Sequence, residues 1–355
     1  RRTTPAAPGL RRGGPAAAPP ATGPRPANKA PQRRRTSATA SEDPADDAMV
    51  ARARERFAAE RRHLDRRRRQ AERRGSLPNL IVIGGLKCGT TSLHHYLNLH
   101  PQIAMSRPKE LNFFVAELNW ELGSEWYASH FERDAEIRGE TSPHYTNLPR
   151  FAGVAERMRE LLGDGARLIY MVRDPIERML SHYLHNVGGG YESRPMAEAL
   201  ADPDSAYVAR SRYAMQLEPY LAAFERERVR VVANEELAGE RDATLRGVFE
   251  YLGVDAGFRS EQFEREWETG SGKQDGGFRL MDRAVRLPGL RAIDRNFDRL
   301  PESLRWLVER VVHDPGRGPA PKPQLPPPLR ATLVELLRDD VAELERITGR
   351  SFGWL

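Results

Sequence analysis

Cysteine is almost missing from this chain of 355 residues, whose single cysteine is Cys88. One thiol excludes an intrachain disulfide framework, and no cysteine and histidine cluster has the spacing of a zinc site. This usage is typical of a protein of the reducing cytosol. The length fits one large domain or two small ones, with a core large enough to need no covalent staples.

Long apolar runs are missing as well. No stretch approaches the roughly eighteen consecutive apolar residues of a membrane span, and the N-terminus has no apolar run of the secretory kind. The sequence therefore predicts a cytoplasmic protein without an integral membrane segment. Because residue 1 is arginine rather than methionine, a targeting segment ahead of it stays open.

Positive charge is concentrated at one end of the chain. Residues 1–77 carry 20 basic and 8 acidic side chains, whereas residues 78–355 carry 36 basic and 42 acidic ones. Residues 1–50, with nine prolines and twelve alanines, predict a disordered tail because they bury too little apolar surface to fold. Residues 51–76 predict an Arg-rich charged helix or linker. Nucleic-acid binding by this tail is one hypothesis, but no aromatic residues alternate with the arginines, so we expect no nucleic-acid partner.

The remainder, residues 77–355, predicts one α/β domain with a central parallel sheet flanked by helices, because short apolar runs alternate with helical patterns. The runs predict strands at 80–83, 103–106, 136–140, 167–172 and 229–233, and helices at 90–99, 150–162, 175–187, 205–226 and 329–347. Residues 270–277 predict a glycine-rich loop, and residues 315–328 predict a proline-rich connector. Phe352 and Trp354 are expected to dock on the domain.

A glycine-rich loop separates the first predicted strand from the first predicted helix. Gly84 and Gly89 have the G-x-x-x-x-G spacing of a phosphate loop, in which backbone N–H groups and a helix N-terminus bind an anion. Loops that bind nucleoside triphosphates have lysine directly after the second glycine, where this chain has Thr90. Its lysine lies inside the loop, at Lys87. This favours a shorter 5′ group over an ATP-using phosphotransferase, which stays the alternative, and over a tight turn without a ligand.

A second candidate site follows the strand predicted at 167–172. Arg173 lies at the carboxyl end of that strand, where parallel α/β sheets bind ligands. Asp174 is suited to cap the next helix and Pro175 to its first turn. Ser181, two turns into the helix, is placed to reach the same anion as Arg173. The structural alternative is an ion pair between Arg173 and a neighbouring carboxylate.

The segment Lys87-Cys-Gly-Thr-Thr-Ser92, with Arg173 and a serine eight residues later, resembles sulfotransferases that use 3′-phosphoadenosine 5′-phosphosulfate (PAPS). The resemblance implies a P-loop-kinase-like sulfotransferase fold, PAPS as co-substrate and no metal. In that family the loop holds the 5′-phosphosulfate, and the arginine and serine hold the 3′-phosphate. The implied PAPS-binding residues are Lys87, Cys88, Gly89, Thr90, Thr91, Ser92, Arg173 and Ser181, with Tyr213 and Lys273 as further candidates.

Other segments extend the resemblance over residues 78–355, toward bacterial carbohydrate-type enzymes and heparan sulfate glucosaminyl sulfotransferases. They are residues 109–114, 139–145, 211–213, 231–252 and 348–354. In that branch a glutamate before a Phe-Phe pair is the base, which implies Glu110 here, with Lys87 as the cation that stabilises the departing phosphate. His144 is kept as a candidate acceptor contact. The chain departs from the glucosaminyl enzymes at Thr141, where they carry lysine, and in having no cysteine pair for their disulfide.

The implied reaction moves a sulfuryl group from PAPS to a hydroxyl or amine of a carbohydrate, lipid or small-molecule acceptor. The net negative charge of residues 78–355 favours an uncharged acceptor over a long polyanion. Two residues keep a structural interpretation beside the functional one. Glu110 is also suited to a helix start, and Cys88 is either a thiol activated by Lys87 or, as we favour, a small spacer.

Overall fold

The structure is a computed structural model that describes residues 47–48, 50–52, 54–55, 57, 76–131, 134–264 and 323–355. Its sheet has five parallel strands in the order β2-β3-β1-β4-β5. They are β1 (Leu80–Gly84), β2 (Ile103–Met105), β3 (Ile137–Thr141), β4 (Arg167–Val172) and β5 (Val229–Ala233). The predicted α/β class is confirmed, and each strand lies within one residue of its predicted bounds.

Several predicted segments lie outside the described residues. These are most of the tail at 1–50, most of the charged segment at 51–76, the loop at 270–277 with Lys273, and most of the connector at 315–328.

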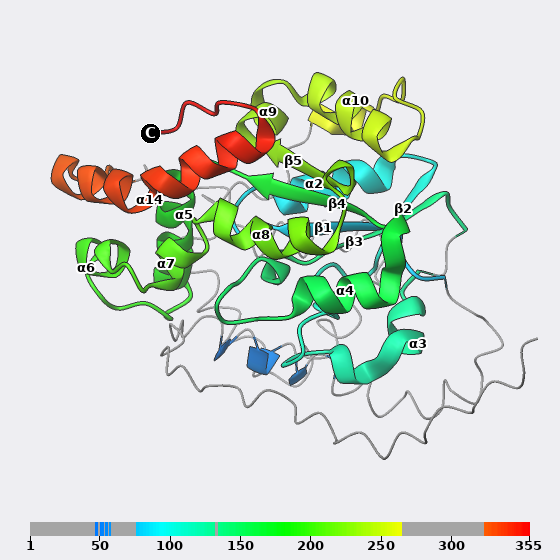
Figure 1. Ribbon diagram of the computed structural model, residues 1–355, viewed down its shortest axis with the longest axis horizontal. Coiled ribbons are helices and arrows are strands. Elements are labelled where there is room, and N and C mark those ends of the chain that lie inside the picture. Colours follow the sequence, from blue (N-terminus) through cyan, green and yellow to red (C-terminus); the bar gives the residue numbers. More distant parts are fainter. Residues whose placement is uncertain are drawn as a thin grey trace, which may run out of the picture. The chain divides into compact units, whose positions relative to one another are not determined.

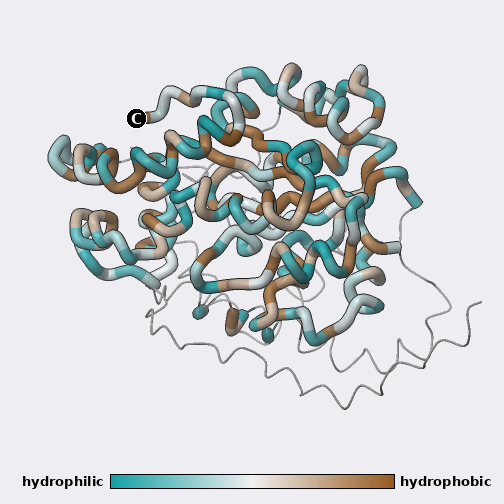
Figure 2. The backbone as a smooth tube through the Cα atoms, viewed as in Figure 1, coloured by the Kyte–Doolittle hydropathy of each residue, from teal (hydrophilic) through white to brown (hydrophobic). Residues whose placement is uncertain are grey.

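The sheet is covered by helices on both faces. Because both faces are covered, β1 reads as an unbroken apolar run, and all five of its residues are buried. Figure 2 shows the hydrophobic residues gathered along the central strands and the inner sides of the helices. In Figure 1, α8 lies in front of the central strands, and α4 lies next to α8.

The helices have the following bounds. The α-helices are α2 (Thr90–Leu99), α3 (Gly123–Ala128), α4 (Val154–Leu162), α5 (Pro175–Gly188), α6 (Met196–Ala201), α7 (Ala206–Ala209), α8 (Tyr213–Ala223), α9 (Asn234–Gly239), α10 (Arg241–Leu252) and α14 (Pro327–Thr348). The 3-10 turns are η1 (Trp120–Leu122), η2 (Pro143–Tyr145), η3 (Gly163–Gly165), η4 (Arg226–Arg228) and η5 (Glu261–Glu264).

One predicted helix is divided in the structure. The pattern at 205–226 predicts a continuous helix, but α7 ends at Ala209 and α8 begins at Tyr213. At the break, Ser211 Oγ accepts a hydrogen bond from Arg178 Nε (2.7 Å) and donates one to Pro175 O (3.1 Å). These contacts to α5 give the chain polar partners outside a helix, so the prediction of one continuous helix was wrong.

The C-terminal helix α14 supports the start of α8. The carboxylate of Asp340 accepts hydrogen bonds from the backbone N–H groups of Ala214 and Met215, both at 3.0 Å. This contact satisfies donors that a helix N-terminus leaves without intrahelical partners. Beyond α14, Trp354 is buried and its ring lies 6.0 Å from that of Tyr213, as the predicted docking requires.

Phe57 shows that the core includes a residue from the predicted charged segment. Its side chain is 1% exposed, and its ring meets Trp126 edge-on at 5.3 Å. We expect Phe57→Ala to lower the free energy of unfolding by about 3 kcal/mol, because it leaves a cavity beside Trp126. Denaturant unfolding measures the change, with the exposed Glu55→Ala as control. Equal stability of the two variants would contradict this packing.

Candidate functional site

The strand order brings three chain segments to one edge of the sheet. The chain leaves β1 toward β2 and leaves β4 toward β5, on opposite sides, so the adjacent carboxyl ends of β1 and β4 form the topological switch point at which open parallel sheets bind ligands. The end of β3 lies on the other side of β1, because Thr141 pairs with Val82. The predicted phosphate loop, Arg173 and the segment after Thr141 therefore share this edge.

The glycine-rich loop runs from the end of β1 to the start of α2. Gly85 N donates to Met171 O of β4 at 2.6 Å, which ties the loop to the neighbouring strand. Lys87 and Gly89 have positive φ values of 66° and 81°, and α2 begins directly afterward at Thr90. This left-handed turn ahead of a helix N-terminus is suited to hold an anion. Thr90 is buried, and Thr91 and Ser92 are half-buried in the first turn.

Gly89 is a position where only glycine fits. A Cβ there would lie 2.2 Å from Asn234 Oδ1, and the φ of 81° disfavours any other residue. We expect Gly89→Ala to displace the loop and to weaken binding of adenosine 3′,5′-bisphosphate roughly 5- to 150-fold, from the 1 to 3 kcal/mol that local strain costs. Calorimetry measures the affinity. Gly239→Ala is the matched control, because nothing lies within 4 Å of a Cβ there, and equal affinities for both variants would refute the expectation.

Arg173 faces the loop from the end of β4. Its Nη1 donates to Lys87 O at 3.5 Å, and its Nη2 lies 3.6 Å from Glu177 Oε2, so the ion pair foreseen as the structural alternative is present. Asp174 caps α5 as predicted, since its Oδ1 accepts from Ile176 N and from Glu177 N. Arg173 thus joins the phosphate loop to the start of α5, in which Ser181 is half-buried.

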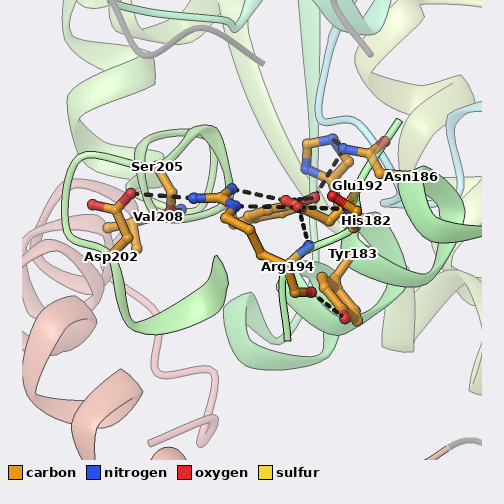
Figure 3. Close-up of polar contacts among 10 residues, drawn as sticks. His182, Tyr183, Asn186, Glu192, Arg194, Asp202, Ser205 and Val208 are labelled. Carbon is orange, nitrogen blue, oxygen red and sulfur yellow. Dashed lines mark hydrogen bonds and ion pairs between the residues drawn. The ribbon is translucent and has the colours of Figure 1, made fainter. Parts of the chain in front are cut away.

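A polar network fixes the other end of α5 (Figure 3). Arg194 and Glu192 form a two-pronged ion pair, with Nε to Oε1 at 3.1 Å and Nη2 to Oε2 at 2.7 Å. Asn186 on α5 donates to Tyr207 Oη at 3.0 Å, and Tyr207 in turn donates to Glu192 at 3.2 Å. The loop after α5 is therefore attached to the helix that follows Arg173.

Cys88 lies against the core side of the loop. Its side chain is fully buried, and Sγ lies 3.6 Å from Tyr213 Oη. Burial raises the pKa of the thiol to about 11, whereas the guanidinium of buried Arg178 acts in the opposite direction. A neutral, enclosed thiol agrees with the spacer interpretation. Tyr213 is equally enclosed, and its contact with a nucleotide stays a prediction.

Glu110 lies in a loop beside the end of β3, not at a helix start. Its φ is 66°, its N–H donates to Thr141 O at 3.0 Å, and its carboxylate pairs with Lys109. The Glu110 side chain is 39% exposed, so an acceptor has access to the carboxylate.

His94 connects α2 with the end of β3, to which the Glu110 loop is also bonded, and sequence reasoning missed it. One turn into α2, its Nδ1 lies 3.0 Å from Thr141 Oγ1. Burial lowers the pKa of His94 to about 3, with Lys109 acting in the same direction, so the ring is neutral. The only sequence signal was its position four residues after Thr90. Thr141, which departs from the resembling branch, thus has a neutral histidine as its partner.

His144 is buried in η2, with Nδ1 3.0 Å from Arg210 Nη2. Arg210 also donates from Nε to Asn147 Oδ1 at 2.7 Å. Contact between His144 and an acceptor stays a prediction.

Glu140 is a buried carboxyl that the sequence did not single out. It is 0% exposed, and within the described structure neither carboxylate oxygen makes a hydrogen bond of ordinary geometry. Burial raises its pKa to about 7, although neighbouring hydroxyls act in the opposite direction. These hydroxyls belong to Tyr145, Ser142 and Tyr127.

The raised pKa gives a pH dependence of stability. Because the folded chain binds this proton more tightly, protonated Glu140 contributes stability that is present below about pH 4.5 and lost as the pH rises through about 7. The Glu140→Gln variant has no ionisable group at this position. Between about pH 5 and 8, we expect the wild type to lose roughly 2 to 3 kcal/mol more stability than this variant. Denaturant unfolding tests this, and parallel pH curves would contradict it.

Comparisons with known proteins agree with this arrangement. The family model described as sulfotransferase domain matches residues 77–278. The chain is 45% identical over 112 residues to the membrane-associated sulfotransferase kil1 of Dictyostelium discoideum, covering 30% of this chain and 22% of the relative. It is 28% identical over 188 residues to mouse heparan sulfate glucosamine 3-O-sulfotransferase 3A1, covering 50% and 46%. The chain therefore spans about a fifth to a half of the length of these relatives.

A solved structure gives the same result for the fold. A sulfotransferase from Alicyclobacillus acidocaldarius superposes with a TM-score of 0.55 at 25% identity, over 79% of this chain and 99% of that one. The fold is thus shared with an enzyme of that class. Among the described residues, none of the helices has both the length and the apolar character needed to cross a membrane.

Proposed function

Because the chain belongs to the sulfotransferase domain family, we propose that it transfers a sulfuryl group from PAPS to a hydroxyl or amine of a carbohydrate acceptor. The observation that carries the proposal is the contact of Arg173 with Lys87 O, which brings the two predicted phosphate-binding segments together. The loop offers backbone N–H groups, hydroxyls and a lysine in one turn, a donor set that fits a phosphosulfate.

In the proposed reaction, Glu110 takes the proton of the acceptor while the acceptor atom forms a bond to sulfur. The bond between sulfur and the bridging oxygen breaks, and adenosine 3′,5′-bisphosphate leaves. Lys87 offsets the charge that develops on the departing phosphate. Arg173 and Ser181 hold the 3′-phosphate, and Thr90, Thr91 and Ser92 hold the 5′ group.

We propose a carbohydrate acceptor because the mouse relative is a sulfotransferase of heparan sulfate glucosamine. The acidic balance of residues 78–355 favours a short or uncharged sugar. Incubating the full chain with radiolabelled PAPS and a panel of neutral oligosaccharides, sulfated oligosaccharides, lipids and small phenols tests this. Labelling confined to lipids or small phenols would overturn the acceptor class. The cytoplasmic location is kept as part of the proposal, and cell fractionation tests it.

The first measurement is calorimetry of the full chain with adenosine 3′,5′-bisphosphate and, separately, with ATP and magnesium. We expect binding of the bisphosphate. Preference for ATP would instead support the phosphotransferase alternative, in which the position of Lys87 within the loop has no bearing on the ligand.

A further inference from the structure

The loop that carries Glu110 is attached to the end of β3 at alternate residues. Three of its backbone N–H groups donate to the segment 141–145. The pairs are Glu110 N to Thr141 O (3.0 Å), Asn112 N to Ser142 Oγ (3.0 Å) and Phe114 N to Tyr145 Oη (3.4 Å). Two of the three acceptors are therefore side-chain hydroxyls, whose orientation is not fixed by the backbone.

These two hydroxyls need an acceptor for the hydrogen bonds that they donate themselves. A hydroxyl whose oxygen accepts from a backbone N–H makes its best second bond by donating to another acceptor. The carboxyl of Glu140 is fully buried and close enough to Ser142 and Tyr145 for both hydroxyls to stabilise its charged form. A buried carboxylate without other partners is a strong acceptor.

We propose that Glu140 is a positioning residue for sulfuryl transfer, whose carboxylate orients the Ser142 and Tyr145 hydroxyls so that they hold the Glu110 loop. The inference rests on the proposed function, because it takes Glu110 to be the base. Glu140 itself touches neither PAPS nor the acceptor in this account.

The loop needs such support because its backbone is strained. Glu110 and Asn112 have φ values of 66° and 49°, which residues other than glycine seldom adopt. The hydrogen bonds from residues 112 and 114 hold this conformation on both sides of Phe113.

The aromatic pair after Glu110 is held from the same side. Phe113 stacks on Tyr127 with centroids 4.2 Å apart and an angle of 6°, and Phe114 meets Tyr145 at 5.6 Å. Both phenols are close enough to Glu140 for its charge to raise their pKa. One carboxyl thus acts electrostatically on the partners of both phenylalanines.

The titratable groups that face Glu140 are Tyr127 on α3 and Tyr145 on η2. Burial raises the pKa of both phenols well above their usual value, so they stay neutral. Glu140 is then the group of this cluster that changes charge near neutral pH. If its charged form orients the hydroxyls, turnover rises as the pH passes through about 7.

The test compares Glu140→Gln and Tyr145→Phe with the wild type in the full chain. The readouts are turnover of PAPS, with water or 4-nitrophenyl glucosaminide as acceptor, and affinity for adenosine 3′,5′-bisphosphate. We expect each variant to lose roughly 10- to 100-fold in kcat, as a misplaced base does, with unchanged bisphosphate affinity. Glu140→Gln should also lose the rise in turnover near pH 7 while being no less stable than the wild type at about pH 8.

Tyr251→Phe is the matched control, since it removes a phenol that donates to Leu168 O and Arg228 O away from this edge. Its kcat should stay at the wild-type level. Wild-type kcat in Glu140→Gln, or an equal loss in Tyr251→Phe, would overturn the positioning role. If Glu140→Gln does not fold, Tyr145→Phe decides alone.

The two proposals fail in different ways. A wild-type chain that neither binds the bisphosphate nor consumes PAPS overturns both. A wild type that is active, with an inactive Glu110→Gln and a normal Glu140→Gln, overturns the positioning role alone.

Discussion

Glu110→Gln is expected to abolish sulfuryl transfer while leaving nucleotide binding intact. The amide keeps the size of the side chain but cannot take the acceptor's proton, which costs roughly 10²- to 10⁴-fold in kcat. The backbone bond from Glu110 N to Thr141 O does not depend on the side chain, so the loop keeps its place. Single-turnover consumption of radiolabelled PAPS, beside calorimetry with adenosine 3′,5′-bisphosphate, separates the two effects.

Glu121→Gln is the control for this result, because Glu121 is exposed on η1. It should match the wild type in both assays. Near-normal turnover in Glu110→Gln would assign the base to another group, of which His144 is the candidate named from the sequence. A joint loss of turnover and binding would mean that Glu110 supports the loop and not the chemistry.

Arg173→Ala is expected to weaken binding of adenosine 3′,5′-bisphosphate roughly 10- to 100-fold, the value of a charge-assisted hydrogen bond to phosphate. The 3′-phosphate would lose its cation, and Lys87 O would lose its Nη1 donor. Lys87→Ala should lower kcat as well, because the departing phosphate loses its counter-charge. Calorimetry and initial rates over a range of PAPS concentrations separate the two variants.

Comparing nucleotides with and without a 3′-phosphate tests whether Arg173 binds that group. Arg173→Ala should weaken the bisphosphate much more than adenosine 5′-phosphate, which has no 3′ group. Arg246→Ala, an exposed change on α10, controls for charge alone. Equal weakening of both nucleotides would place Arg173 at the 5′ group instead.

The sequence predicted the parts of the site that depend on local patterns. A continuous apolar run predicted β4 with its observed bounds, and Asp174-Pro175 predicted the start of α5. The loop from Gly84 to Gly89 lies between a strand and a helix as its spacing required. In each case neighbouring residues decide the structure, so periodicity and capping rules suffice.

The parts that sequence reasoning missed depend on distant residues. The break between α7 and α8 needs Arg178 and Asp340, which lie 33 residues before Ser211 and 126 residues after Ala214. A lone glutamate in a strand gives no sign that Glu140 is buried. The left-handed conformation of Glu110 likewise follows from its contact with β3, thirty-one residues later. Such pairings become visible only after the sheet has brought the segments together.

The segment that matches the family model is shorter than the domain that folds as a unit. The match to the family model ends at residue 278, yet Asp340 accepts a hydrogen bond at the start of α8 and Trp354 packs on Tyr213. Phe57, from before residue 77, is also buried in the core. Residues 77–278 alone therefore lack contacts that the folded domain uses. Expressed alone, this segment would keep the phosphate loop but lose the packing contacts that support it. The family match and the folded domain therefore have different boundaries in this chain.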